Sequence, residues 1–144
     1  MQSKYLMRKE KKLFNIYVLG NPLLKKDANP LKFLPYLRKY FKNVAFQELD
    51  PTETFPEEEH LILLDTILNI KEIKILEDID KIVFSPAYSL HDFDLGFTLK
   101  LMKKLSKLKK VTIIGIPHSY PQKKALQELS LIIPSLLSGN GSHN

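Results

Sequence analysis

Residues that could bind a divalent metal or transfer a proton follow the apolar segments that we expect to be strands. They are Gly20, Asn21 and Asp27 after the first segment, Asp50, Thr52 and Glu53 after the second, Asp65 at the end of the third, Ser89, His91 and Asp92 after the short segment that ends at Phe84, and His118 and Ser119 after the last. Carboxylate and imidazole ligands suit zinc, nickel or manganese. In an open α/β sheet, ligands bind beyond the carboxyl ends of the strands. We therefore expect these residues to gather at one sheet edge.

Each candidate also has a purely structural interpretation. A loop aspartate such as Asp27 commonly caps a turn, and His91 is also compatible with the polar start of a helix. His60 precedes the third apolar segment and is expected at its solvated amino end. Asp65 is the strongest candidate, because a carboxylate that follows four buried apolar residues costs free energy unless it has a partner. From the residues alone, these alternatives stay open.

The sequence contains no established catalytic motif. G-x-S-x-G, the P-loop pattern and H-E-x-x-H are all absent, so no nucleophilic elbow, phosphate cradle or zincin helix is indicated. The chain also has no cysteine, which excludes thiolate metal sites, disulfides and a cysteine nucleophile. No residue is therefore assigned a catalytic role.

Apolar patterning predicts an alternating series of strands and helices. The predicted strands span residues 13–19, 44–49, 60–65, 73–76, 82–84 and 111–116, and the predicted helices span residues 31–41, 92–105 and 122–137. The segments HLILLD and VTIIGI are almost wholly apolar, which is typical of strands buried on both faces. The alternation predicts an α/β three-layer sandwich, in which a twisted, mostly parallel sheet of about five strands carries helices on both faces.

Two of the predicted helices contain a proline. Proline removes a backbone donor and is best tolerated in the first helical turn. Pro35 therefore fits its helix only if it lies within the first turn, and Pro134 is expected to mark a kink or a boundary.

Length and charge bound the organisation of the chain. Its 144 residues suit one domain, and we expect a basic arm over residues 1–12, a single α/β domain over 13–137 and a flexible tail over 138–144. The net charge of +6 permits weak binding to polyanions. The lysines between 103 and 110 lack the interleaved aromatic residues of a nucleic-acid site, so no specific nucleic-acid partner is expected. No apolar run approaches the length of a membrane span.

Four segments of the chain resemble one known family. VLGNPLLKKD, HLILLD, SLHDFDLGF and VTIIGIP occur in the order and at the spacing found in the hydrogenase maturation endopeptidases. The resemblance runs from about Phe14 to Leu137, and the HDFDLGF form looks most like an archaeal-type branch. The fold of this family, a twisted five-stranded sheet between helices, agrees with the pattern above.

The resemblance implies a metal-recognising trio and an activity. The trio comprises Asp27, which lies six residues after Asn21, together with Asp65 and His91. By resemblance, the protein is a metal-dependent, aspartic-type peptidase whose trio contacts Ni²⁺ presented by the substrate, with Zn²⁺ or Cd²⁺ as surrogates. The residues implied in substrate binding are Gly20, Asn21, Asp50 and Thr52.

The implied substrate is the precursor of a [NiFe]-hydrogenase large subunit. The enzyme would remove the C-terminal extension of that subunit after nickel insertion. We expect it to act as a monomer in the cytoplasm, without a membrane partner.

Two other functions are compatible with the same fold. The first is a non-catalytic α/β module that binds a protein partner or a polyanion. It is favoured by the net charge, by Lys26 beside Asp27, and by a turn, LGN, that lacks the first glycine of the family pattern G-x-G-N. The second is a small-molecule hydrolase, for which no nucleophile–base pair can be named.

Overall fold

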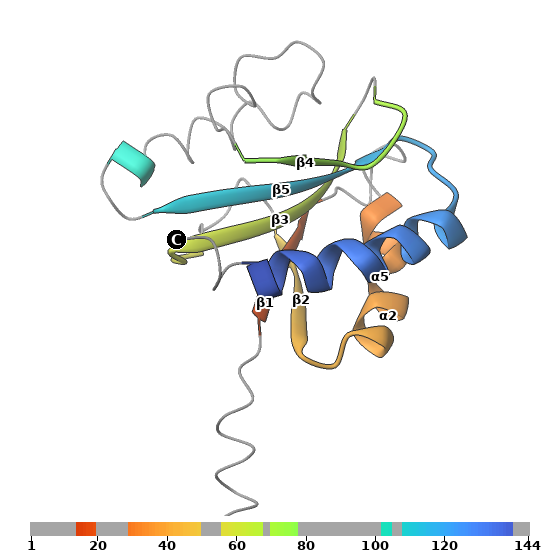
Figure 1. Cartoon of the computed structure of the whole chain (residues 1–144), viewed down its shortest axis with the longest axis horizontal. Coiled ribbons are helices and arrows are strands. Elements are labelled where there is room, and N and C mark those ends of the chain that lie inside the picture. The colour runs from red at the N-terminus through yellow and green to blue at the C-terminus, as the bar shows by residue number, and fades with distance from the viewer. Residues whose placement is uncertain are drawn as a thin grey trace, which may run out of the picture.

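The computed structural model of the chain describes residues 14–19, 29–49, 56–67, 70–77, 102–104 and 108–139. Their strands form one five-stranded sheet in the order β2-β1-β3-β5-β4. The strands are β1 (Phe14–Leu19), β2 (Val44–Leu49), β3 (His60–Ile67), β4 (Lys74–Leu76) and β5 (Lys110–Pro117). β2, β1, β3 and β5 run parallel to one another, and β4 runs antiparallel to β5 at the edge (Figure 1). The predicted α/β fold with a mostly parallel sheet is confirmed.

The two central strands are buried along almost their whole length. β3 is buried from Leu61 to Ile67, and β5 is buried from Val111 to Pro117. This confirms that their continuous apolar runs mark strands covered on both faces. β3 is longer than predicted, because Thr66 and Ile67 continue its pairing with β5. Asp65 therefore lies within β3 rather than at its end.

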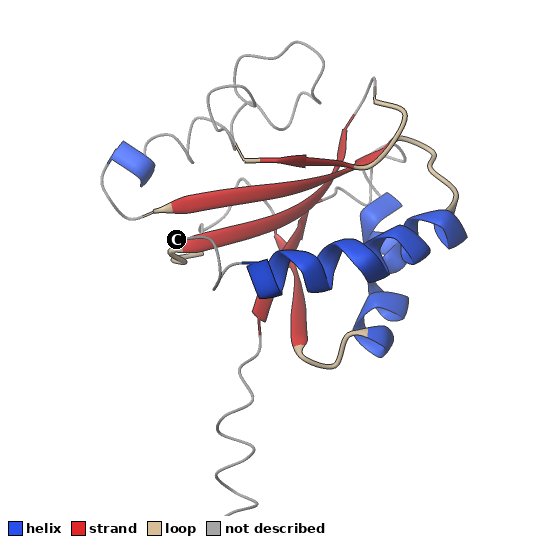
Figure 2. Ribbon diagram, viewed as in Figure 1, coloured by secondary structure: helices blue, strands red, loops and turns tan. Residues whose placement is uncertain are grey.

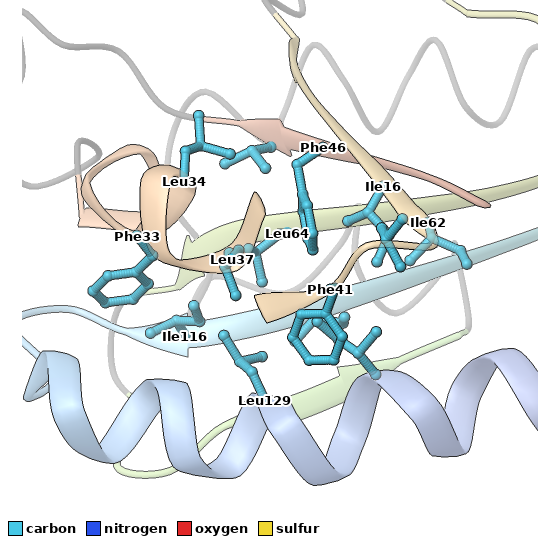
Figure 3. Packing of buried hydrophobic residues seen from close by; sticks show 14 of the residues in the cluster. Ile16, Phe33, Leu34, Leu37, Phe41, Phe46, Ile62, Leu64, Ile116 and Leu129 are labelled. Atoms are coloured by element: carbon cyan, nitrogen blue, oxygen red, sulfur yellow. The ribbon is translucent and has the colours of Figure 1, made fainter. Parts of the chain in front are cut away.

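Two helices, α2 (Asn29–Tyr40) and α5 (Gln122–Gly139), cover one face of the sheet (Figure 2). Leu37 of α2 and Leu129 of α5 are fully buried against Leu64 and Ile116 of the sheet, as Figure 3 shows. The helical stretch 102–104 contributes Met102 to the cluster on the opposite face, which also contains Leu108. The rest of the predicted helix 92–105 and the predicted strand 82–84 lie outside the described residues.

Both helices contain a proline beyond the first turn. Pro35 lies inside α2 and Pro134 lies inside α5, so the first-turn requirement for Pro35 was wrong, and Pro134 is not a helix boundary. Both prolines are exposed, so water can reach the backbone where the proline removes a hydrogen bond. Leu37, two residues after Pro35, and Ile133, directly before Pro134, are both buried. We attribute the continuity of both helices to this packing.

Other element bounds differ little from the prediction. β2 spans the predicted residues, β1 begins one residue later, and α2 begins two residues earlier. α5 continues through Ser138 and Gly139, beyond its predicted end. The predicted arm over residues 1–12 and residues 140–144 of the predicted tail lie outside the described residues.

Candidate functional site

Asp65 is the predicted site residue that the structure describes. Its side chain is buried, with an exposed fraction of 1%. Its carboxylate Oδ1 accepts a hydrogen bond of 2.7 Å from the backbone N–H of Thr66. Because side chains alternate along a strand, Asp65 lies on the face of β3 that carries Leu61 and Leu63, opposite the face covered by α2 and α5.

The pairing of the strands sets the position of Asp65 relative to the sheet edge. Parallel pairing places Val18 beside Leu64 and Leu19 beside Leu49, so β1 and β2 end close to the level of Asp65. β3 and β5 continue for two further residues, to the Ile67–Pro117 pair. The carboxylate is thus slightly recessed behind the carboxyl edge of the sheet, which is the edge where α/β folds bind ligands.

Gly115 forms the β5 side of this site. It pairs directly with Asp65, and its missing side chain leaves space that Ile67 fills. A Cβ atom built on Gly115 would lie 2.2 Å from Cδ1 and 2.9 Å from Cγ1 of Ile67. A glycine is therefore required beside Asp65 to let Ile67 pack over β5.

The other predicted site residues lie outside the described residues: Gly20, Asn21, Asp27, Asp50, Thr52 and His91. The structure therefore places one member of the Asp/Asp/His trio, and the meeting of all three stays a prediction. Among the described residues, no group of three or more histidine, aspartate or glutamate side chains could hold a metal ion. The described helices also include none that is long and apolar enough to cross a membrane.

His118 and Ser119 follow β5 at the same edge of the sheet. Both are exposed, and Ser119 has a left-handed backbone with φ of 62°. The Ser119 hydroxyl lies 3.4 Å from a ring nitrogen of His118. His118 and Ser119 are thus exposed to solvent at the carboxyl end of β5, whereas the side chain of Asp65 is buried.

A polar network that the sequence did not predict lies at the opposite, amino edge of the sheet. Nε2 of His60 lies 2.9 Å from Oγ1 of Thr112, and that hydroxyl donates to Oε2 of Glu77 at 3.4 Å. Because the Thr112 hydroxyl donates its hydrogen to Glu77, its oxygen must accept from His60. Nε2 of His60 therefore carries a hydrogen and is the donor. The Lys110 ammonium lies 3.6 Å from the same carboxylate oxygen.

This network corrects the expectation that His60 is simply solvated. The side chain is half-buried, and burial lowers the pKa of His60. The positive charge of Lys110 reinforces this effect, and the negative charge of Glu77 opposes it. The signal that could have found the site is Thr112, a hydroxyl residue in an otherwise apolar buried strand.

The lowered pKa of His60 predicts how stability depends on pH. The unfolded chain, with an ordinary histidine pKa, binds the proton at a higher pH than the folded chain does. The free energy of unfolding should therefore fall as the pH drops below the ordinary value of 6.5 and through the folded pKa. We expect urea denaturation at about pH 7.5 and about pH 5.5 to show a smaller pH dependence for His60→Gln than for the wild type. Equal pH dependence in the two proteins would contradict this role of His60.

A second polar network joins β1 to the segment before β3. Oε2 of Glu58 accepts hydrogen bonds from the Tyr17 hydroxyl at 2.6 Å and from Nδ2 of Asn15 at 3.0 Å. Burial and the neighbouring carboxylate raise the pKa of Tyr17 above its ordinary value. Gln47 of β2 donates to Asn15 at 3.1 Å. These contacts tie β1 to β2 and to the segment before β3, and they do not involve Asp65.

Comparison with known proteins gives structural matches only. No protein-family model matches the sequence, and no curated protein matches it. The structure is similar to that of the hydrogenase maturating endopeptidase HybD from E. coli, with a TM-score of 0.60 and 21% identity over 88% of this chain and 94% of that one. A solution structure of an endopeptidase from Escherichia coli gives a TM-score of 0.59 and 20% identity over 88% and 94% of the two chains.

A third similar structure is the endopeptidase HycI from Escherichia coli. Its TM-score is 0.53, with 18% identity over 80% of this chain and 85% of that one. The resemblance predicted from the four sequence segments is thus confirmed in the architecture, whereas the archaeal-type branch stays a prediction. The chain has the fold of the hydrogenase maturating endopeptidases.

Proposed function

We propose that the protein is an endopeptidase that removes the C-terminal extension of a [NiFe]-hydrogenase large-subunit precursor. The observation that carries the proposal is the buried carboxylate of Asp65, recessed at the carboxyl edge of the sheet. The fold shared with three endopeptidases supports it. So does the ordered set of sequence segments that surrounds Asp65 in the chain.

Asp65 is proposed to act with Asp27 and His91. Two carboxylates and an imidazole form a donor set that suits Ni²⁺, with Zn²⁺ or Cd²⁺ as surrogates. The nickel is part of the substrate, because the precursor presents it after insertion. The trio thereby verifies that the precursor is loaded and positions its scissile peptide bond.

The other proposed contacts are with the peptide itself. Gly20, Asn21, Asp50 and Thr52 follow β1 and β2, whose described ends lie near the level of Asp65. We assign these residues to binding the precursor. Two routes are chemically open for attack on the peptide bond: a carbonyl polarised by the metal, or a water activated by the metal or by a carboxylate. The protein is proposed to carry out this reaction as a monomer.

Thermal unfolding with added metal tests the trio. We expect Ni²⁺, Zn²⁺ or Cd²⁺ to raise the Tm of the wild type, because a ligand that binds only the folded state stabilises it by about 2.7 kcal/mol at a hundred times its Kd. Asp65→Ala and His91→Ala should each remove this rise. A rise that both variants keep would show that the metal binds elsewhere.

The competing function is a non-catalytic binding module with the same fold. It predicts no stabilisation by metal and no cleavage of a precursor. The two functions differ in the predicted role of Asp65, which is essential for the peptidase and has no function in the binding module.

A further inference from the structure

A groove runs between α2 and α5 on the face of the molecule that these helices form. One cavity of about 550 Å³ is lined by Tyr36, Lys39 and Tyr40 of α2 and by Leu126 and Ser130 of α5, among others. A second cavity of about 370 Å³ adjoins it and continues along α5 past Pro134. Phe41 lines both cavities. The described part of the chain thus has an elongated apolar groove, on the opposite side of the sheet from Asp65.

Two tyrosines at the rim of this groove are exposed. Tyr36 and Tyr40 have exposed fractions of 52% and 66%, and they lie one helical turn apart, so both project from the same side of α2. The Tyr40 ring meets the buried Phe41 ring edge-on, with centroids 4.8 Å apart. Tyrosine side chains in such a position are enriched at protein interfaces, where they contribute much of the binding energy.

The charges of the two helices are almost all positive. α2 and α5 carry five cationic residues and one acidic residue. The five are Lys32, Arg38, Lys39, Lys123 and Lys124. Lys39 lines the groove, whereas Arg38 donates to the backbone carbonyl of Phe46 and the Lys124 ammonium lies 5.2 Å from the centroid of the Tyr120 ring. Glu128, the acidic residue, accepts a hydrogen bond of 2.7 Å from the Tyr120 hydroxyl. An occupant with acidic residues beside an apolar stripe would complement both the groove and the charges around it.

We propose that the groove between α2 and α5 binds an acidic, amphipathic segment of a partner protein. Apolar side chains of that segment would fill the two cavities. Its carboxylates would face Lys39, which lines the first cavity, and Lys123, which lies one helical turn before Leu126 and Gln127 of the same lining. Since the groove and Asp65 lie on opposite faces of the sheet, the proposal is independent of peptidase activity.

Charge disfavours the two other occupants. The N-terminal residues 1–12 carry five cations, Lys4, Arg8, Lys9, Lys11 and Lys12, against Glu10 alone. A second copy of the chain docked through the same helices would bring equally cationic surfaces together. Like charges placed across an interface destabilise it.

The test uses a pair of designed peptides and the full-length chain. The first is a fluorescein-labelled peptide of about 16 residues with leucine at helical spacing and glutamate elsewhere, and the second replaces every glutamate with lysine. We expect fluorescence anisotropy to show binding of the acidic peptide only. Tyr40→Ser and Lys39→Glu should each weaken it about tenfold or more. Lys103→Glu makes the same charge change at an exposed lysine outside the groove, and it should leave the affinity near that of the wild type.

Several outcomes would overturn the proposal. One is equal binding of the acidic and the basic peptide, and another is an equal loss of affinity in Lys39→Glu and Lys103→Glu, which would indicate unspecific attraction. No binding of the acidic peptide up to about 1 mM protein would also overturn it. Sedimentation that shows a dimer in the wild type but not in Tyr40→Ser would identify a second copy as the occupant. Tighter peptide binding after Leu6→Ser with Met7→Ser would identify the N-terminal residues instead.

Discussion

Asp65→Asn is expected to slow cleavage of a nickel-loaded precursor by about 100-fold or more, while the protein stays folded. A metal ion that polarises the reacting carbonyl supplies several kcal/mol of transition-state stabilisation, and this is lost when the carboxylate no longer positions the metal. About 2.7 kcal/mol corresponds to a hundredfold change in rate. Asparagine has nearly the same shape and keeps an oxygen that can accept from the N–H of Thr66, the bond that Asp65 makes at 2.7 Å. The measurement is the rate of appearance of the shortened subunit on a gel, with circular dichroism to confirm the fold.

Thr66→Val is the matched control for this change. Thr66 is the next residue of β3, is fully buried, and lies on the opposite face of the strand. Its hydroxyl has no hydrogen-bond partner among the described residues, so a nearly isosteric apolar side chain should cost little stability. Thr66→Val should therefore cleave the precursor at close to the wild-type rate. Equal activity in Asp65→Asn and the wild type would remove Asp65 from the site.

Gly115→Val is expected to lower the free energy of unfolding by about 3 kcal/mol, the upper end of the usual cost of overpacking a core. The cause is Ile67, whose Cδ1 and Cγ1 atoms lie 2.2 Å and 2.9 Å from the position of the new Cβ. Ile67 is itself buried, with an exposed fraction of 2%, so it has little room to move. Urea denaturation of the variant and the wild type measures the difference.

A double-mutant cycle shows whether this contact is the cause. Ile67→Ala keeps only the Cβ of Ile67, which is 3.6 Å from the built Cβ of residue 115. The single change Ile67→Ala should cost about 2–5 kcal/mol through the cavity that it creates. The double variant should lose less stability than the two single variants together, by about 0.5–3 kcal/mol. If the stability losses of the two single variants simply add in the double variant, the cost of Gly115→Val arises from another contact.

The sequence predicted the elements of the sheet well because their patterns are local. The apolar runs of β3 and β5 identify strands without any tertiary information. The order of the strands and the antiparallel direction of β4 were not predicted, since strand pairing depends on contacts between distant segments. For a similar reason, the sequence did not predict continuous helices around the interior prolines of α2 and α5, and a kink at Pro134 stays a prediction. The cost of these prolines is offset by packing against the sheet, which the local pattern does not show.

The site was predicted in part. The burial of Asp65 follows from the apolar residues before it, but its position within β3 depends on the pairing of Thr66 and Ile67 with β5. The role of Gly115 could not be predicted, because the side chain that fills its space comes from the neighbouring strand. The half-buried state of His60 likewise depends on Thr112, 52 residues away in the chain.

The central claim is that this chain cleaves a hydrogenase precursor only after nickel insertion. The most direct measurement incubates the full-length wild type with a [NiFe]-hydrogenase large-subunit precursor from the same organism, prepared with and without nickel. Mass spectrometry of the subunit then reports whether its C-terminal extension has been removed. We predict cleavage of the nickel-loaded precursor and none of the nickel-free form. Equal cleavage of both forms would contradict recognition of the metal, and no cleavage of the loaded form would contradict the proposed activity.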